Sequence, residues 1–316
     1  MKDNFISICI PAYKRIDFLQ KLLDSIAVQT FRDFEVIITD DSPSDDVQVF
    51  CKNYEDKFIL RYYRNRKAFG SPENWNEAIR KATGEWIKLM HDDDWFADTK
   101  SLEKFATAAK IQQAGFIFSG YTNVFIETGK KATYSMNGWE RHLLRKSPVN
   151  LLKKNFIGHP STTLIRNNRG NWYDPNFKWV VDIEFYIRVL REGSAYYYIP
   201  EPLVNLGMSS AQVTATSFRI PSIEIPENIE LLRKLSPASL KRMYAYDYYW
   251  RFIRNLSVRD MQVVAQYYSG AAVPLLLQKM IRQQNYISAK LMQFGVIAKI
   301  TMLGTYCWNR LRGRMY

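Results

Sequence analysis

Short apolar runs alternate with amphipathic stretches over roughly the first two hundred residues of the chain. Phe5–Ile10 is a β-rich run ended by Pro11, and apolar side chains then recur at helical spacing over Ile16–Val28. Further continuous apolar runs occupy Phe34–Thr39 and Phe58–Tyr63. Continuous runs of this kind are typical of parallel strands whose two faces are both covered by helices. The pattern therefore predicts an α/β fold.

A helix followed by a fourth strand leads to the most polar point of this region. Ser71-Pro72-Glu73 predicts a helix start, with Ser71 as the cap and Pro72 in the first turn. Trp86–Met90 predicts a strand that ends at His91-Asp92-Asp93-Asp94. Ligands of open α/β sheets bind at the carboxyl ends of the strands. We therefore expect three polar clusters to meet in one crevice: Ala12–Arg15, Asp40–Asp41 and Asp92–Asp94.

The pattern changes in the last third of the chain. Before it we expect a helix over Thr99–Gln113, strands over Phe116–Phe125 and Gly158–Arg166, and a helix over Asp182–Leu190. From about residue 220 the chain becomes helical, rich in Tyr, Arg and Leu, and interrupted by prolines. The sequence thus predicts an α/β domain over residues 1–218 and a basic helical region over residues 219–316.

Positive charge is concentrated at the C-terminal end. The formal net charge is +13, and the residues after Asp260 include no Asp or Glu but seven basic side chains: Lys279, Arg282, Lys290, Lys299, Arg310, Arg312 and Arg314. Such an end suits an anionic membrane surface, a phosphate-bearing substrate or nucleic acid, and charge alone does not choose among them.

One apolar segment in this basic end has nearly the length of a membrane span. Leu291–Trp308 contains Gln293 and Lys299, which argues against a buried span. Lys290 and Lys299 would lie on roughly opposite faces of one helix, which argues against a simple in-plane amphipathic helix. Partial embedding, or packing with basic residues toward lipid headgroups, is compatible with the segment.

The N-terminus and the cysteines indicate in which cell compartment we expect the protein. Phe5–Ile10 follows almost directly on the first residue, with no basic leader or long apolar segment before it. The three cysteines, Cys9, Cys51 and Cys307, have neither disulfide-framework nor zinc-site spacing. We expect a cytoplasmic protein.

Three consecutive aspartates at the end of an apolar strand raise one another's pKa unless a positive charge lies among them. Magnesium or manganese bound by one or two carboxylates completes its shell with water and substrate phosphates, which suits a nucleotide diphosphate. The alternative interpretation of Asp92–Asp94 is a solvated acidic turn that caps the helix near Asp98.

Three ordered segments carry a family resemblance. They are Ser7–Arg15 (SICIPAYKR), Glu35–Ser42 (EVIITDDS) and Gly84–Trp95 (GEWIKLMHDDDW), and their order and spacing resemble the family 2 glycosyltransferases of GT-A fold. The resemblance covers residues 5 to 215. It implies a Rossmann-like, mostly parallel sheet flanked by helices, and an enzyme that transfers sugar from a nucleotide donor with inversion.

The resemblance implies a donor site at the ends of the early strands. Pro11, Ala12, Tyr13 and Arg15 would line the nucleotide pocket, and Asp40 or Asp41 would accept the ring N–H of a pyrimidine. Arg66, Asn74 and Trp75 correspond to donor-side positions. The alternatives are a turn with a helix cap at Asp40–Asp41, a solvated Arg66 and a core Trp75.

The acidic segment departs from the family pattern in one position. A frequent form there is Leu-Asp-x-Asp-Asp, and alignment on Trp95 places His91 where the first aspartate is expected. If this alignment holds, Asp93 leads the metal ligands, and His91 or Asp92 faces the ribose; if Asp92-x-Asp94 is the functional pair, Asp94 ligates the metal. The implied ligands are therefore Asp92, Asp93 and Asp94, holding Mn²⁺ or Mg²⁺.

The resemblance also implies a general base. Val181–Arg188 (VDIEFYIR) is similar to the family's Glu-Asp-x-Asp-x-Trp segment, in which the second acid is the base, so Asp182 takes that role and Val181 replaces the first acid. The alternative is that Asp182 only caps a helix, with Glu184 in its first turn. His159, Trp179 and Glu184 are weaker candidates for the acceptor side, with His159 alternatively a structural histidine in a turn.

These residues predict a single in-line displacement, in which Asp182 activates the acceptor hydroxyl while cation and basic side chains stabilise the leaving diphosphate. The expected donor is a UDP- or dTDP-sugar. The expected acceptor is a glycan on a lipid carrier at the inner face of the cytoplasmic membrane, in bacterial surface-polysaccharide assembly of the O-antigen or capsule type. Nucleic acid is not expected as a partner. The rival functions are a sugar-nucleotide nucleotidyltransferase, which would normally have a Gly-rich loop after the first strand, and a non-catalytic membrane or nucleic-acid binding module.

Overall fold

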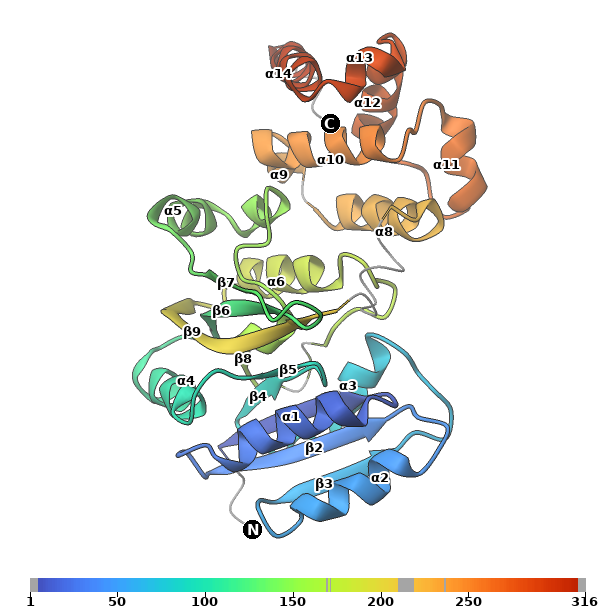
Figure 1. Cartoon of the computed structure of the whole chain (residues 1–316). Coiled ribbons are helices and arrows are strands. Elements are labelled where there is room, and N and C mark those ends of the chain that lie inside the picture. The colour runs from blue at the N-terminus through green and yellow to red at the C-terminus, as the bar shows by residue number, and fades with distance from the viewer. Residues whose placement is uncertain (1–4, 169, 171, 210–218, 236, 312–316) are drawn as a thin grey trace. The chain divides into compact units, whose positions relative to one another are not determined.

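The computed structural model describes residues 5–168, 170, 172–209, 219–235 and 237–311. These residues form two compact units (Figure 1). The first unit contains the described residues of Met1–His142, Phe156–Phe177 and Glu184–Gln212, and the second contains those of Leu143–Asn155, Lys178–Ile183 and Val213–Tyr316. Residue 218, where the sequence predicts the domain boundary, lies outside the described residues, so that boundary stays a prediction.

A mixed sheet of nine strands is the framework of the first unit, in the order β3-β2-β1-β4-β8-β6-β9-β5 with β7 beside β6. The first four strands on this path are mutually parallel, whereas β8 is antiparallel to both β4 and β6. The strands are β1 (Ile6–Ala12), β2 (Phe34–Asp40), β3 (Leu60–Arg64), β4 (Trp86–Leu89), β5 (Asp94–Phe96), β6 (Phe116–Phe125), β7 (Lys131–Tyr134), β8 (Thr163–Arg166) and β9 (Tyr196–Met208). The predicted α/β class is confirmed, and the parallel part is the early half of the sheet.

Helices bury both faces of the early strands, which explains why β1 and β2 are nearly continuous apolar runs. Ile8 and Ile10 join the apolar side chains of α1, α2 and α4 in one core cluster, and α3 contacts β1 and β2 without contributing to that cluster. The helices of this part are α1 (Ile16–Ala27), α2 (Asp46–Cys51), η1 (Lys52–Tyr54), α3 (Glu73–Lys81), α4 (Ser101–Ile111), η3 (Pro160–Thr162) and, shared with the second unit, α5 (Gly138–Lys146) and α6 (Val181–Arg191).

Two local predictions are wrong. The N-cap of α3 is Pro72, with no side-chain hydrogen bond, so Ser71 is not the cap. The strand expected over Gly158–Arg166 begins only at Thr163, because Gly158 has φ +98 and Pro160, which lacks an N–H, opens the one-turn helix η3.

The second unit is helical in its described residues. It contains η2 (Pro148–Leu152), α8 (Pro221–Lys234), α9 (Pro237–Leu240), α10 (Met243–Asn255), α11 (Met261–Tyr267), α12 (Leu275–Asn285), α13 (Ala289–Gln293) and α14 (Gly295–Leu311). Its core centres on α10, where Tyr246, Tyr249 and Trp250 are almost completely buried. In the part of the chain that the structure describes, no helix combines the length and the apolar character needed to cross a bilayer.

Candidate active site

The structure brings the three polar clusters together at the carboxyl ends of β1, β2 and β4. The Asp41 amide donates to the Ala12 carbonyl at 3.1 Å, and the Lys14 amide donates to the Ser42 hydroxyl at 2.8 Å. Lys14 has φ +64, which turns the chain sharply after β1 and aims Arg15 toward β4. The residues that we expect to line the crevice thus follow three strands that are neighbours in the sheet.

Arg15 bridges two of the three aspartates. Its Nε lies 3.3 Å from Asp92 Oδ2, a terminal nitrogen bonds the other oxygen of Asp92, and Nη1 lies 3.0 Å from Asp93 Oδ2. A guanidinium matches a carboxylate in this bidentate fashion and remains charged at any accessible pH. Asp92, one of the three predicted metal ligands, is therefore committed to Arg15 in this structure.

His91 joins the other two aspartates instead. One ligand atom from each of His91, Asp93 and Asp94 lies within 4.8 Å of the others. His91 Nε2 and Asp94 Oδ2 are buried, and neither has a hydrogen-bond partner among the described residues. Buried polar atoms are rarely left without a partner, so these two mark a place for a further group. An imidazole nitrogen with carboxylate oxygens is a donor set that fits manganese, and the carboxylates also fit magnesium.

Electrostatics at this cluster favour a cation. Burial raises the pKa of Asp94 well above its usual range, and the neighbouring Asp93 charge raises it further. Burial also raises the pKa of Asp92 to about 7, against the opposing effect of Arg15. Burial lowers the pKa of His91 to about 4, so the imidazole is neutral and its free nitrogen can act as a ligand. A positive ion among these carboxylates would stabilise their ionised form and offset the effect of burial.

The rings of Trp75 and His159 lie near the acidic cluster. The Trp75 ring lies 4.6 Å from the His91 ring and packs edge-on against Tyr173 at 5.2 Å. His159 interacts electrostatically with both His91 and Asp93, and burial lowers its pKa. The predicted acceptor-side residue His159 therefore lies near the acidic cluster.

Some of the remaining donor-side candidates already make hydrogen bonds within the protein, and others face solvent. Asp40 accepts hydrogen bonds from the Ser42 amide and the Tyr62 hydroxyl, and Asp41 accepts from Asn65 and the amides of residues 69 and 70. Asn74 donates to the carbonyls of Ala12 and residue 39, which ties α3 to the ends of β1 and β2.

Two donor-side candidates are open to solvent. Tyr13 is half exposed. Arg66 is exposed and makes no hydrogen bond or ion pair within the described residues.

Asp182 is the second residue of α6 and lies in the second unit. Its Oδ2 accepts a hydrogen bond from Asn155 at 2.8 Å, and its Oδ1 accepts from the Ile183 amide at 2.8 Å. Burial raises the pKa of Asp182 to about 6, although these hydrogen bonds oppose the rise. The groups that shift the pKa of Asp182 are neutral hydrogen-bond donors. A pKa near 6 lets the carboxylate both take and release a proton near neutral pH.

The segment before Asp182 is held by a residue from α8. Glu227 accepts the backbone N–H groups of Lys178, Trp179 and Val180 at 2.8, 2.8 and 3.1 Å. The acceptor-side candidate Trp179 is thus anchored through its backbone. Glu184, in contrast, is buried in an ion pair with Arg188 at 3.0 Å within the first unit.

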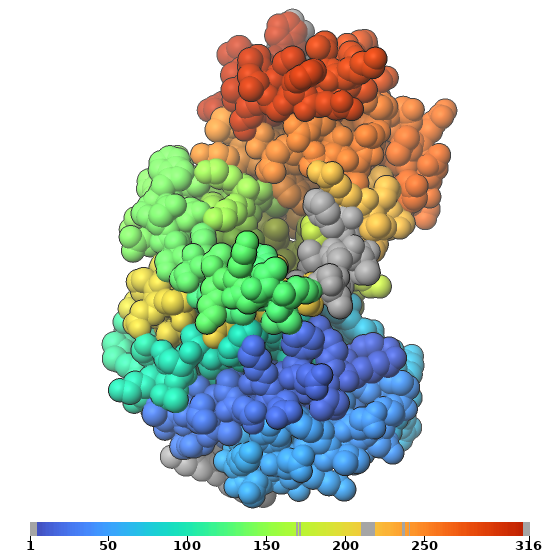
Figure 2. Space-filling view, viewed as in Figure 1, coloured from blue at the N-terminus to red at the C-terminus, as the bar shows by residue number. Residues whose placement is uncertain are grey.

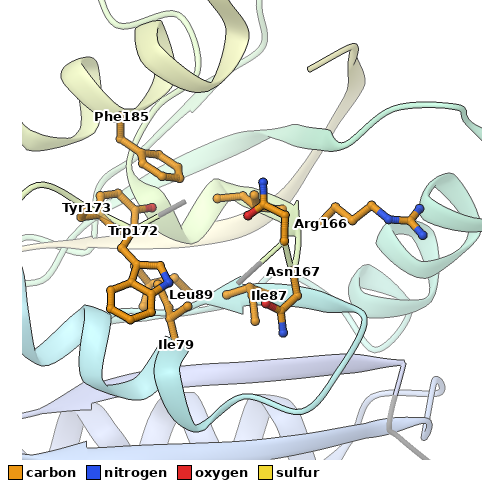
Figure 3. A pocket seen from close by; sticks show the side chains of 10 residues that line it. Ile79, Ile87, Leu89, Arg166, Asn167, Trp172, Tyr173 and Phe185 are labelled. Carbon is orange, nitrogen blue, oxygen red and sulfur yellow. The ribbon is translucent and has the colours of Figure 1, made fainter. Parts of the chain in front are cut away.

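An apolar pocket lies beside β4. Figure 3 shows Trp172, Tyr173 and Phe185 facing Ile87 and Leu89 across this pocket. None of its lining residues is among the predicted donor, metal or base residues. We therefore place the candidate active site at the strand ends and not in this pocket.

Comparison with known proteins decides the family. The model of glycosyl transferase family 2 matches residues 7–168, about half of the chain. The chain belongs to this family. A curated relative of this glycosyltransferase is the GalNAc(5)-diNAcBac-PP-undecaprenol beta-1,3-glucosyltransferase of Campylobacter jejuni, 31% identical over 122 residues, which are 38% of this chain and 37% of the relative.

Two solved structures share the fold of this glycosyltransferase. Staphylococcus aureus TarS in complex with UDP-GlcNAc is 15% identical and covers 98% of this chain and 92% of its own, with a TM-score of 0.64. The mannosyltransferase PcManGT from Pyrobaculum calidifontis, in complex with GDP-Man and Mn²⁺, is 14% identical and covers 100% of this chain and 88% of its own, with a TM-score of 0.55. The predicted GT-A fold is confirmed by these similarities.

Sequence reasoning missed three residues that shape the site of this glycosyltransferase. Lys88 is fully buried in β4 and donates to the Ser161 carbonyl; burial lowers its pKa to about 7, and Asp94 opposes that shift. A lysine inside an apolar strand was an available signal for it. Gly207 lies so close to the acidic loop that a Cβ there would overlap the Asp93 carbonyl, and Glu227 binds a segment 47 to 49 residues before it in the chain. These last two had no local signal.

Proposed function

We propose that this glycosyltransferase moves a sugar from a nucleotide diphosphate donor to an acceptor hydroxyl with inversion, using Mn²⁺ or Mg²⁺ as cofactor. The observation that carries the proposal is the cluster of His91, Asp93 and Asp94 at the carboxyl end of β4, where two buried atoms have no hydrogen-bond partner among the residues that the structure describes. Asp93 and Asp94 would hold the cation, with His91 as the third ligand, and the cation would neutralise charge on the donor diphosphate.

The chain's own residues bind and orient the donor in this proposal. Arg15 keeps the Asp92 carboxylate in place and remains available to a phosphate, since a third of its side chain is exposed. Asp40 or Asp41 accepts the pyrimidine N–H, with Pro11, Ala12 and Tyr13 lining the nucleotide pocket. Asn74 holds the strand ends in register, and Arg66 is free to reach phosphate or base.

Asp182 is the proposed base. Its carboxylate takes the proton of the acceptor hydroxyl as oxygen attacks the anomeric carbon, and the bond to the nucleotide diphosphate breaks on the opposite face. A base with a pKa near 6 is mostly ionised at neutral pH and still accepts a proton in the transition state. His159 and Trp179 are proposed to contact the acceptor, whereas the ion pair of Glu184 with Arg188 supports a positioning role for that residue.

The proposed donor is a UDP- or dTDP-sugar, and TarS, a structure of the same fold, is bound to UDP-GlcNAc. The proposed acceptor is a glycan on a lipid carrier, in bacterial surface-polysaccharide assembly; the name of the Campylobacter relative contains PP-undecaprenol, a lipid-linked diphosphate. With such an acceptor, the protein would work in the cytoplasm at the inner membrane face, where its basic C-terminal end meets anionic lipid.

The test is a panel of sugar nucleotides assayed for nucleoside diphosphate release with and without Mn²⁺ or Mg²⁺. We expect release from one donor class that depends on the metal and increases with the correct acceptor. Release of pyrophosphate would point to a nucleotidyltransferase. Absence of metal-dependent donor binding across the panel would contradict the proposal.

A further inference from the structure

Helix α14 has two unlike faces, and its more polar face is the one turned inward. Tyr306 donates to the Lys241 carbonyl at 2.6 Å, and Asn309 donates to the Tyr246 hydroxyl at 2.9 Å. Ala298 and Met302 are buried on the same face. The helix is therefore fixed to α10 and its flank by hydrogen bonds as well as by apolar packing.

The outward face of α14 is apolar. Val296, Ile300 and Leu303 follow one another at spacings of four and three residues, so they form one stripe along the helix. Val296 is 73% exposed and Ile300 is 65% exposed. Leu291 and Phe294, just before the helix, and Trp308, near its end, are also exposed. Figure 2 shows the last helices of the chain, in red, at the surface of the second unit.

Exposed side chains of this size in one contiguous stripe are uncommon on a protein that works alone in water. Covering the stripe with an apolar partner would remove this apolar area from water, which is favourable.

Basic side chains on α14 and on the two helices before it point to the kind of partner. Arg282, Lys290 and Arg310 are exposed, and Lys299 reaches Asp247 at 2.9 Å. No Asp or Glu follows Asp260 in the sequence. Two copies of this surface would bring like charges together, which disfavours self-association through it. Apolar side chains bordered by cations match the headgroup region of an anionic bilayer.

The prediction against a simple in-plane helix assumes that Lys290 and Lys299 lie on one helix. In the structure Lys290 belongs to α13 and Lys299 to α14, with residue 294 between the two helices. Their relative angle on a single helical wheel therefore has no bearing on the surface of α14.

We propose that the stripe of Val296, Ile300 and Leu303, with the basic side chains around it, inserts into the headgroup region of an anionic lipid bilayer with α14 lying in the membrane plane. This inference deepens the membrane part of the proposed function and rests on it. It is independent of the sugar-transfer reaction, because lipid binding needs no donor.

The experiment measures binding of the full chain to vesicles of phosphatidylcholine alone and of phosphatidylcholine mixed with phosphatidylglycerol. The test variant is Val296→Glu/Ile300→Glu. Its matched control is Val49→Glu/Ile111→Glu, which changes the same residue types at 61% and 68% exposure in the first unit. Because all four side chains are exposed, circular dichroism and the melting temperature should agree among the three proteins.

We expect the wild type to bind the mixed vesicles, with weaker binding at high salt, and the test variant to bind at least about tenfold more weakly than the control. Equal binding of test and control variants would overturn the proposal. So would light scattering that shows a wild-type dimer converted to a monomer by the test variant without a change in vesicle binding. Donor turnover without vesicles, measured in the same proteins, separates failure of this surface from failure of the transferase proposal.

Discussion

The charges of two acidic sites in this chain, Asp92–Asp94 and Asp182, are balanced in different ways. Asp92 and Asp93 face the guanidinium of Arg15, and Asp94 retains a buried oxygen with no hydrogen bond within the described residues. Asp182 is surrounded by neutral donors, Asn155 and a backbone amide. The first arrangement is suited to holding a fixed positive group, and the second is suited to a carboxylate that changes its protonation state.

The difference follows from the elements that carry the two sites. The acidic cluster follows a central strand, so burial is severe and opposite charge is needed. Asp182 lies in the first turn of a helix, where free amides stabilise a carboxylate without adding a full charge. Four changes test this contrast, from the largest expected effect to the smallest.

Asp94→Asn should have the largest effect. The amide keeps the shape of the side chain but removes the negative charge that a cation requires, so metal-dependent nucleoside diphosphate release should fall by roughly 10³-fold. Cation affinity, measured by titration calorimetry with Mn²⁺, should fall in parallel. Asp56→Asn, an exposed aspartate, serves as the control. Unchanged Mn²⁺ affinity in Asp94→Asn would remove this residue from the proposed ligands.

Asp182→Asn should separate the two sites. We expect kcat to fall by about 10²-fold, because the asparagine cannot accept the acceptor proton, while donor and Mn²⁺ affinity stay near wild type. Rapid-quench kinetics and donor titration measure the two quantities. A parallel loss of donor affinity would show that Asp182 acts on the donor and would reject its assignment as base.

The pH profile should report the state of Asp182. Only the ionised carboxylate accepts a proton, so kcat should rise as pH increases through about 6 and level off above it. Asn155 donates to this carboxylate and lowers its pKa, so Asn155→Ala should move the rising limb to higher pH by roughly half a unit or more. A limb that stays in place in Asn155→Ala would assign the titration to another group.

Glu227→Gln should have the smallest effect. The side chain anchors three backbone amides before Asp182, and its neutral replacement accepts them more weakly, so unfolding free energy should fall by about 2 kcal/mol. Thermal and denaturant melts measure this change. Glu192→Gln, at an exposed position, is the control and should leave stability unaltered. Equal stability of both variants would show that the anchor contributes little.

Much of the early fold follows from local patterns. The runs at Ile6–Ala12 and Phe34–Asp40 are apolar because both faces of these strands are covered, and such runs are recognisable without the structure. The later part of the sheet is harder to predict. Strand β8 is antiparallel to β4 and β6, whereas β9 is parallel to β6 and antiparallel to β5, and the turn at Gly158–Pro160 shortens the expected strand. Strand direction depends on connections, which hydrophobic periodicity does not encode.

The sequence by itself determined the family, the α/β class and the residue types of the candidate site, because these reside in ordered segments such as Gly84–Trp95. Only the tertiary structure decided which contacts those residues make. It committed Asp92 to Arg15 and grouped His91 with Asp93 and Asp94, and it brought Glu227 to the backbone before Asp182. It also turned the apolar stripe of α14 outward. These choices depend on contacts between residues far apart in the chain, and burial and charge compensation act only once those residues meet.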